Sequence, residues 1–231
     1  SWNETGRRSV SARALPCAKV LTTLVPGAGH LVHMPTHIYM RLGMWEPAVE
    51  HNVEAVAVDE KFIEDRNPGG VYPMGYYPHN LDVMLAALCM LGRESDAIAA
   101  ARKIVKADSH ELALQVPPVE SFTTKPLFTL ARFSRWDEIL QEPAPPAGLR
   151  YLTGVWYYAR GLAHSAGGRY DSASVALDSV AAIGPSLPLD LPASLNPARS
   201  IMAIAEKHLR ADIAARQGRR DEAMAELKKG I

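Results

Sequence analysis

The sequence predicts an all-α fold, a right-handed solenoid of about five helical hairpins, and three observations lead to this prediction. A small residue is followed five positions later by a small or apolar one, repeatedly and between helix-like stretches. Apolar residues recur at helical spacing, and no segment alternates convincingly with the period of a β-strand. A hydrophobic content of 48% is enough to bury a substantial core. We therefore expect stacked helices and no substantial sheet.

The repeated element predicts where each hairpin turns. A glycine can end a helix in a left-handed turn, and the alanine after it allows the next helix to pack closely. The clear copies, followed by one weaker copy, are Gly43 to Ala48, Gly92 to Ala97, Gly168 to Ala173, Gly218 to Ala223, and Ser134 to Ile139.

These turns divide the chain into hairpins separated by loops rich in proline and glycine. The predicted hairpins span residues 30–60, 78–107, 120–141, 149–183 and 196–231. The predicted loops between them run from Arg66 to Pro78, Gln115 to Pro118, Glu142 to Gly148, and Gly184 to Pro197. We interpret them as loops between repeats, so residues 12–231 form one array.

The turn element resembles the tetratricopeptide repeat, a hairpin of about 34 residues with an aromatic residue two positions after the glycine. Trp45, Trp136 and Tyr170 occupy that aromatic position. The interval from Ser134 to Gly168 has the standard length, and the other intervals are longer, so they must contain insertions. The resemblance implies a right-handed solenoid with a concave binding surface.

Two histidine motifs add a more specific resemblance. The run from Ala28 to Tyr39 contains HxxHMPxHI, and the run from Tyr76 to Leu81 contains YYPHN. Both resemble a bacterial family of large tetratricopeptide proteins without an assigned reaction. The likeness covers residues 12–231 and leaves residues 1–11 unmatched. Members carry a further histidine-bearing helix upstream and more repeats downstream, so the resemblance implies that this chain is a fragment of a longer protein.

Composition argues against several classes of partner. Lys and Arg together number 25, as do Asp and Glu, so nucleic acid and anionic membranes are poor candidates. Only two cysteines occur among the 231 residues, which favours the reducing cytoplasm over a disulfide framework. No apolar run approaches the roughly 20 residues of a membrane-spanning helix. The composition is compatible with a homo-oligomer.

The histidine spacing predicts a cluster. His30, His33 and His37 share one face of a helix, and counting back from the turn glycines makes His79 the counterpart of His30 on the next hairpin. We therefore expect four imidazoles to face one concave groove. Pro35 complicates this expectation, because a helix that began there would leave His30 in a loop.

A metal site is one interpretation of this cluster. Imidazole binds zinc, copper and iron, and His33 and His37 are one helical turn apart, with His30 or His79 completing a three-histidine site. Asp82 and Cys89 are further candidate ligands. Glu120 is a candidate general base if metal-bound water is present.

The leading interpretation is a binding module that holds a peptide or small ligand in the groove. Its candidate contacts are His33, His37, His79, Asn80, Tyr158 and Arg160, the last as a clamp for a ligand carboxylate. The sequence contains no HExxH motif, so catalysis stays an open question. A plain scaffold whose activity lies in other repeats is the third alternative.

Overall fold

The computed structural model describes residues 10–230, and the regular secondary structure in that range is helical apart from two strands of two residues each. The predicted all-α class is confirmed. Residues 1–9, which make up most of the unmatched segment 1–11, lie outside the described residues, as does residue 231. The chain divides into two compact units, Ser1–Ala107 and Asp108–Ile231.

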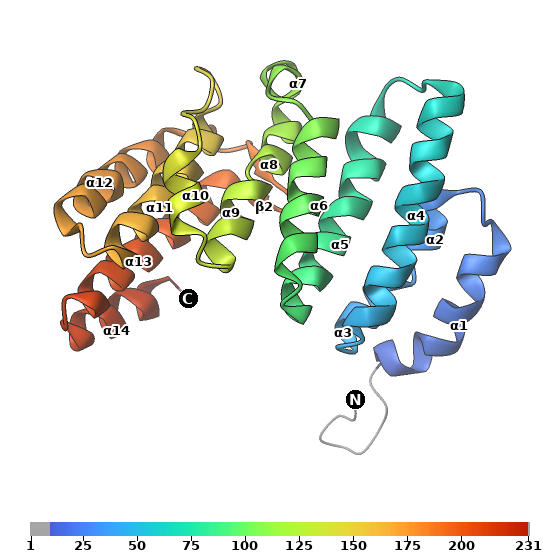
Figure 1. Cartoon of the computed structure of the whole chain (residues 1–231), viewed down its shortest axis with the longest axis horizontal. Helices are drawn as coiled ribbons and strands as arrows, with labels where there is room; N and C mark the ends of the chain where they lie inside the picture. The colour runs from blue at the N-terminus through green and yellow to red at the C-terminus, as the bar shows by residue number, and fades with distance from the viewer. Residues whose placement is uncertain (1–9, 231) are drawn as a thin grey trace. The chain divides into compact units, whose positions relative to one another are not determined.

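Unit 1 consists of helices packed side by side, and α5 lies between α4 and α6 (Figure 1). Helix α2 also packs against α4 and α5. The elements are α1 (Val10–Leu24), α2 (Gly29–His33), α3 (Thr36–Arg41), α4 (Trp45–Arg66), the π-helical turn η1 (Tyr72–Tyr76), α5 (Tyr77–Leu91) and α6 (Glu94–Ala107).

Unit 2 is built around α11, which packs against α12 and α13 (Figure 1). A short antiparallel pair, β1 with β2, precedes α13. The elements are α7 (His110–Gln115), the 3-10 turn η2 (Pro117–Val119), α8 (Glu120–Thr123), α9 (Lys125–Arg132), α10 (Trp136–Gln141), α11 (Arg150–Ala166), α12 (Tyr170–Ser186), β1 (Pro192–Ala193), β2 (Asn196–Pro197), α13 (Ala198–Arg216) and α14 (Arg220–Lys229).

Every predicted hairpin turn adopts the same backbone geometry. Each turn residue has a positive φ, and the amide after it donates to the carbonyl five residues earlier, which is the pattern of a Schellman motif. Gly43, for example, has φ 70°, and the next amide, Met44 N, lies 2.9 Å from Tyr39 O. The other turn residues are Gly92, Ser134, Gly168 and Gly218. The weaker copy at Ser134 is therefore a true repeat of the element, although a non-glycine residue adopts its left-handed conformation.

The small or apolar residue five positions after each turn residue is buried. Ala48, Ala97, Ala173 and Ile139 are 0% exposed and Ala223 is 5% exposed. A side chain in this position lies between the two helices of its hairpin, so a small or well-fitted residue sets how closely they approach. The repeated element thus fixes both the turn and the packing that follows it.

The first helix of two hairpins is interrupted at a proline, as the position of Pro35 suggested. Helix α2 ends at His33 and α3 starts at Thr36, while α8 ends at Thr123 and α9 begins just before Pro126. Proline removes one backbone donor and crowds the preceding turn, which accounts for both breaks. Because Met34 and Pro35 keep right-handed helical angles, the chain does not turn away at the break. His30 therefore belongs to a helix and not to a loop.

The predicted loop from Arg66 to Pro78 is wrong in its second half. Residues Tyr72–Tyr76 form a π-helical turn that runs directly into α5. Pro73 and Pro78 stand in the first turns of these segments, where a missing amide donor costs little. The prolines that suggested a loop therefore stand at the starts of helical segments. As a result, η1 places Tyr76 beside His30.

Candidate functional site

Four histidines of unit 1 bring their rings together. His33 is central, with its ring centroid 4.8 Å from those of His37 and His79 and 5.4 Å from that of His30. The His79 centroid is also 5.9 Å from that of His30 and 5.7 Å from that of His37. The convergence expected from helical spacing is therefore present, with three rings from α2 and α3 and one from α5.

Asn52, on α4, fixes the tautomer of His33. The Asn52 amide nitrogen donates to the carbonyl oxygen of Ala48, so its Oδ1 faces His33 Nδ1 at 2.7 Å. An amide oxygen only accepts hydrogen bonds, and Nδ1 of His33 must therefore carry the proton. In the neutral ring, Nε2 keeps its lone pair and lies on the side of the other histidines.

His33 is held in the neutral form. Its side chain is 0% exposed, and burial lowers the pKa of His33 to about 3, with repulsion from the neighbouring histidines adding to the effect. Its Nε2 lies 3.0 Å from Nε2 of His37, which is exposed and also has a pKa lowered by burial. Because His33 Nε2 carries the lone pair, His37 Nε2–H donates this hydrogen bond in the metal-free protein, and a bound cation would take the place of that proton.

His30 and His79 complete a set of ligand atoms. Among the described residues, one nitrogen each from His30, His33 and His79 forms a group with all atoms within 4.8 Å of one another. His30 Nδ1 is buried and has no hydrogen-bond partner in the described part of the chain. A buried imidazole nitrogen without a partner costs free energy, and a bound cation would remove that cost.

Asp59 joins the elements that carry the cluster. Its carboxylate accepts hydrogen bonds from the Tyr72 hydroxyl at 2.6 Å and from the Asn80 amide at 2.7 Å. Burial raises the pKa of Asp59, while these hydrogen bonds and the electrostatic interaction with His30 oppose the rise. Asp59 on α4 thereby fixes η1 and the start of α5, next to His79.

Gly29 brings α2 against the same carboxylate. A Cβ atom added at Gly29 would overlap the Asp59 side chain and lie 2.7 Å from the carbonyl oxygen of Ala55. Only a glycine allows α2 to approach α4 this closely. Gly29 and Asn80, which both meet Asp59, are the sequence neighbours of His30 and His79. Asp59 therefore holds the backbone beside both histidines.

Three residues that surround the histidines were not predicted from the sequence, namely Asn52, Asp59 and Tyr76. Asn52 and Asp59 are seven residues apart on α4 and both are 0% exposed. Two polar residues on the buried face of an amphipathic helix were the available signal. Tyr76 places its ring 4.6 Å from that of His30, and only the helical conformation of η1, which the proline-rich sequence concealed, brings it there.

Three predicted residues of unit 1 need reassignment. Asn80 was expected to contact a ligand, but it is 0% exposed and its amide donates to Asp59. Its role is therefore to attach α5, next to His79, to α4. Asp82 and Cys89 were expected as additional ligands. Neither belongs to the group of ligand atoms formed by His30, His33 and His79.

Three further predicted residues lie in unit 2, whereas the histidine cluster lies in unit 1. Glu120 is 5% exposed and accepts a hydrogen bond from Leu152 N at 3.0 Å in the first turn of α11. It therefore caps the start of a helix, where unpaired amides attract a carboxylate, and its proposed role as a general base is not supported. Burial raises the pKa of Glu120.

Tyr158 and Arg160 occupy different surroundings in unit 2. The Tyr158 hydroxyl lies 2.9 Å from Nδ1 of His208 on α13. These two residues are counterparts in successive hairpins, as His30 and His79 are in unit 1. Arg160 donates to the carbonyl oxygen of Leu140 at 2.8 Å and lies over the Trp156 ring. Neither residue belongs to the histidine cluster.

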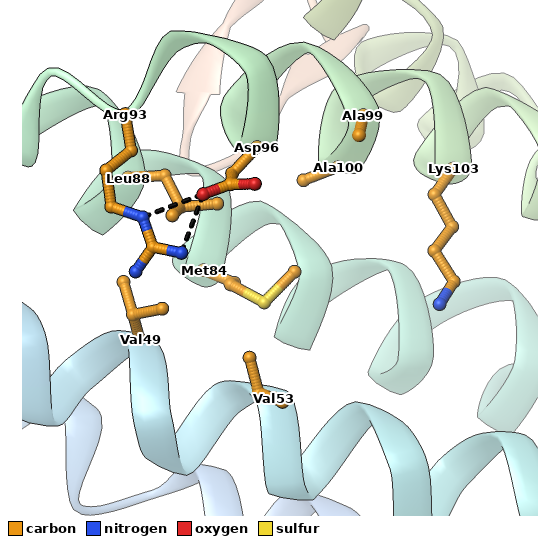
Figure 2. Close-up of a pocket in the computed structure, with 9 residues that line it drawn as sticks. All are labelled: Val49, Val53, Met84, Leu88, Arg93, Asp96, Ala99, Ala100 and Lys103. Atoms are coloured by element: carbon orange, nitrogen blue, oxygen red, sulfur yellow. Dashed lines mark hydrogen bonds and ion pairs between the residues drawn. The ribbon is translucent and has the colours of Figure 1, made fainter.

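A separate pocket of unit 1 is mainly apolar. Figure 2 shows Val49 and Val53 of α4 facing Met84 of α5, with α6 closing the other side. Its volume is about 250 Å³, and its charged groups are already paired, Arg93 with Asp96 at 2.6 Å and Lys103 with Glu60 at 2.5 Å. The remaining lining residues are Leu88, Ala99 and Ala100. This pocket offers apolar contact and contains no histidine.

Comparisons with models of protein families, with curated proteins and with solved structures found no match. Across residues 10–230, no helix is both long enough and apolar enough to cross a membrane. The site geometry is therefore the main basis for a functional proposal.

Proposed function

We propose that unit 1 binds a transition-metal ion through His30, His33 and His79, with His37 as a fourth ligand. The observation that carries the proposal is the set of three imidazole nitrogens within 4.8 Å of one another around a fully buried His33. His33 combines a neutral ring with an Nδ1–H that donates to Asn52. Metal-binding histidines usually donate their second ring nitrogen to an oxygen in this way.

The ligand types narrow the choice of ion. Neutral imidazoles suit zinc, copper, nickel and iron, whereas magnesium and calcium prefer oxygen ligands. No thiolate or carboxylate belongs to the group of ligand atoms found among the described residues. A divalent ion would therefore keep its full charge, and the Asp59 carboxylate, which interacts electrostatically with His30, is the candidate counter-charge. We propose zinc or copper as the ion to test first.

A zinc titration by calorimetry tests this proposal. Wild-type protein and the variants His30→Gln, His79→Gln and His110→Gln are compared at neutral pH, the last as a control because His110 lies in unit 2. Loss of either cluster histidine should weaken binding by roughly a hundredfold, and the control should bind as the wild type does. Equal affinities for wild type and His79→Gln would contradict the proposal.

Binding of a peptide or small ligand by the same histidines is the second candidate. It is supported by the exposed position of His37 and by Tyr76, which is 42% exposed beside His30. His33 is unsuited to direct contact because it is fully buried and bonded to Asn52. Peptide titration followed by the histidine NMR signals distinguishes the two candidates, because only ligand binding shifts His37 and His79 in metal-free protein.

We further propose that the whole chain is a tetratricopeptide-type solenoid. The recurrent Schellman turns and the buried residue after each support this assignment. The contact between Tyr158 and His208 supports it as well, because these residues hold the same register in successive hairpins. Cys17 and Cys89 form no disulfide within the described residues, which fits a reducing compartment, and we propose the cytoplasm as the location.

A further inference from the structure

Another pocket lies within unit 2, between α11 and α12, and it is lined by both polar and apolar side chains. Its volume is about 300 Å³. The residues that line it are Trp156, Tyr157, Arg160, His164, Ser172, Val175 and Ala176. The set combines aromatic rings and small apolar groups with several hydrogen-bond donors, and it contains no carboxylate.

Arg160 is fixed in place on one side of this pocket. One of its terminal nitrogens donates to the carbonyl oxygen of Leu140, and its guanidinium carbon lies 4.6 Å from the centre of the Trp156 ring. The Trp156 indole nitrogen donates in turn to the carbonyl oxygen of Glu142, at 3.1 Å. The guanidinium has five N–H donors, so this anchoring leaves others for a ligand. A positioned arginine loses little conformational entropy when a ligand binds.

His164 adds a neutral donor. Its Nδ1 lies 3.1 Å from Nε of Arg169, which can only donate, so the proton of the neutral ring is on Nε2. Burial lowers the pKa of His164, and the positive charges of Arg169 and Arg160 contribute. The lining therefore carries one formal positive charge, that of Arg160. One charge matches a carboxylate better than a doubly charged phosphate.

The apolar part of the pocket has room for the body of such a ligand. Val175 is 66% exposed, and Trp156 and Tyr157 contact each other edge to face with centroids 5.0 Å apart. We propose that this pocket binds an organic carboxylate with an aromatic or branched apolar body, the carboxylate meeting Arg160 and the body meeting Trp156 and Val175. The site is independent of the histidine cluster and of any metal bound there.

Titration with 3-phenylpropionate and with its uncharged amide tests the proposal. Binding is followed by the indole N–H signal of Trp156 in NMR spectra, assigned with Trp156→Phe. The acid should shift this signal, and the amide should bind about tenfold more weakly or worse. Equal affinities for acid and amide, or no shift at up to about 10 mM acid, would overturn the proposal.

Substitutions of Arg160 test whether this residue binds the carboxylate. Arg160→Met should weaken acid binding by about tenfold and leave amide binding unchanged. Arg150→Met is the matched control, because Arg150 is an exposed arginine on the same helix, bonded to Ser186. If Arg160→Met does not fold, Arg160→Lys keeps the charge but loses the planar fork, and it should bind the acid more weakly than the wild type. Unchanged acid binding by a folded Arg160 variant would refute the proposal.

One more comparison distinguishes a free organic acid from the C-terminal carboxylate of a peptide. A short peptide ending in phenylalanine is titrated with a free and with an amidated C-terminus. If the free peptide binds more tightly than 3-phenylpropionate, the pocket recognises chain ends, and if the small acid binds more tightly, it recognises free acids. Both results support a carboxylate site.

Discussion

The Nδ1 atom of His33 lies 2.7 Å from Oδ1 of Asn52, and this hydrogen bond determines the chemistry of the histidine cluster. It places the proton of His33 on the nitrogen that faces α4 and leaves the lone pair on the nitrogen 3.0 Å from His37. Because the Asn52 amide is itself anchored to Ala48, neither side chain can reverse this arrangement without losing a buried hydrogen bond.

Replacing Asn52 with alanine should weaken metal binding while all four histidines stay in place. Loss of such a supporting hydrogen bond typically costs between tenfold and a hundredfold in affinity, and we expect about that loss for zinc. The exposed Asn196 on β2 provides the control, Asn196→Ala. Competition with a zinc chelator measures both, and an Asn52→Ala protein with wild-type affinity and wild-type circular dichroism would show that the hydrogen bond is not needed.

The stability of the metal-free protein should fall in acid because His33 is buried in its neutral form. Its pKa is about 3 in the folded protein and 6.5 ordinarily, so between these values the unfolded chain binds the extra proton. The stabilisation is complete above pH 6.5 and is lost as the pH falls toward 3. At pH 4.5 we expect a loss of about 3 kcal/mol relative to pH 7.

Urea denaturation at the two pH values, with a chelator present, measures this loss. His33→Leu should be less stable than the wild type at pH 7 because Asn52 loses its partner, yet its free energy of unfolding should change less between the two pH values. Equal pH dependence in both proteins would rule out His33 as the source.

A methyl group at Gly29 should destabilise unit 1. The added Cβ would overlap the Asp59 side chain and crowd the Ala55 carbonyl, so α2 must move away from α4. We expect Gly29→Ala to lower the free energy of unfolding by about 1–3 kcal/mol, the usual cost of overpacking. Gly27→Ala is the control, since its Cβ would meet nothing within 4 Å. Equal midpoints of urea denaturation would show that α2 is not packed as described.

Asp108 should destabilise unit 2 at neutral and alkaline pH. It is 0% exposed, neither carboxylate oxygen has a hydrogen-bond partner within the described residues, and burial raises its pKa to about 7. The folded form therefore holds a proton that the unfolded chain releases above pH 3.8, and stability falls as the pH rises from there to about 7.

Asp108→Asn removes this titration. We compare the free energy of unfolding of the variant with that of the wild type at two pH values. The difference in favour of the variant should be larger at pH 8 than at pH 4, by about 2–4 kcal/mol. The exposed Asp190 gives the control, Asp190→Asn. If thermal denaturation shows the same pH dependence for Asp108→Asn and the wild type, Asp108 does not titrate in this range.

The hairpin turns could be predicted because they depend on local sequence. Gly43 and Gly92 end their helices with hydrogen bonds to residues only a few positions earlier, so a short motif contains all the necessary information. The convergence of His30, His33 and His37 was accessible for the same reason, since they share one short stretch of nearly continuous helical backbone.

The supporting residues could not be predicted because their partners are distant in the sequence. His33 and Asn52 are 19 residues apart, and Asn80 and Asp59 are 21 apart, so these bonds depend on how separate helices pack. Glu120 was misassigned for the same reason, because the helix that it caps begins at Arg150. An acidic residue in a helical stretch gives no local sign of which amide it will meet.

X-ray absorption of the zinc-loaded protein tests the metal site most directly. We predict about one zinc ion per chain, bound by nitrogen ligands at roughly 2.0–2.1 Å with the outer-shell scattering of several imidazoles, and loss of that signal in His79→Gln. Zinc that stays well below one equivalent after reconstitution, or zinc surrounded only by oxygen ligands, would contradict a metal site formed by these four histidines.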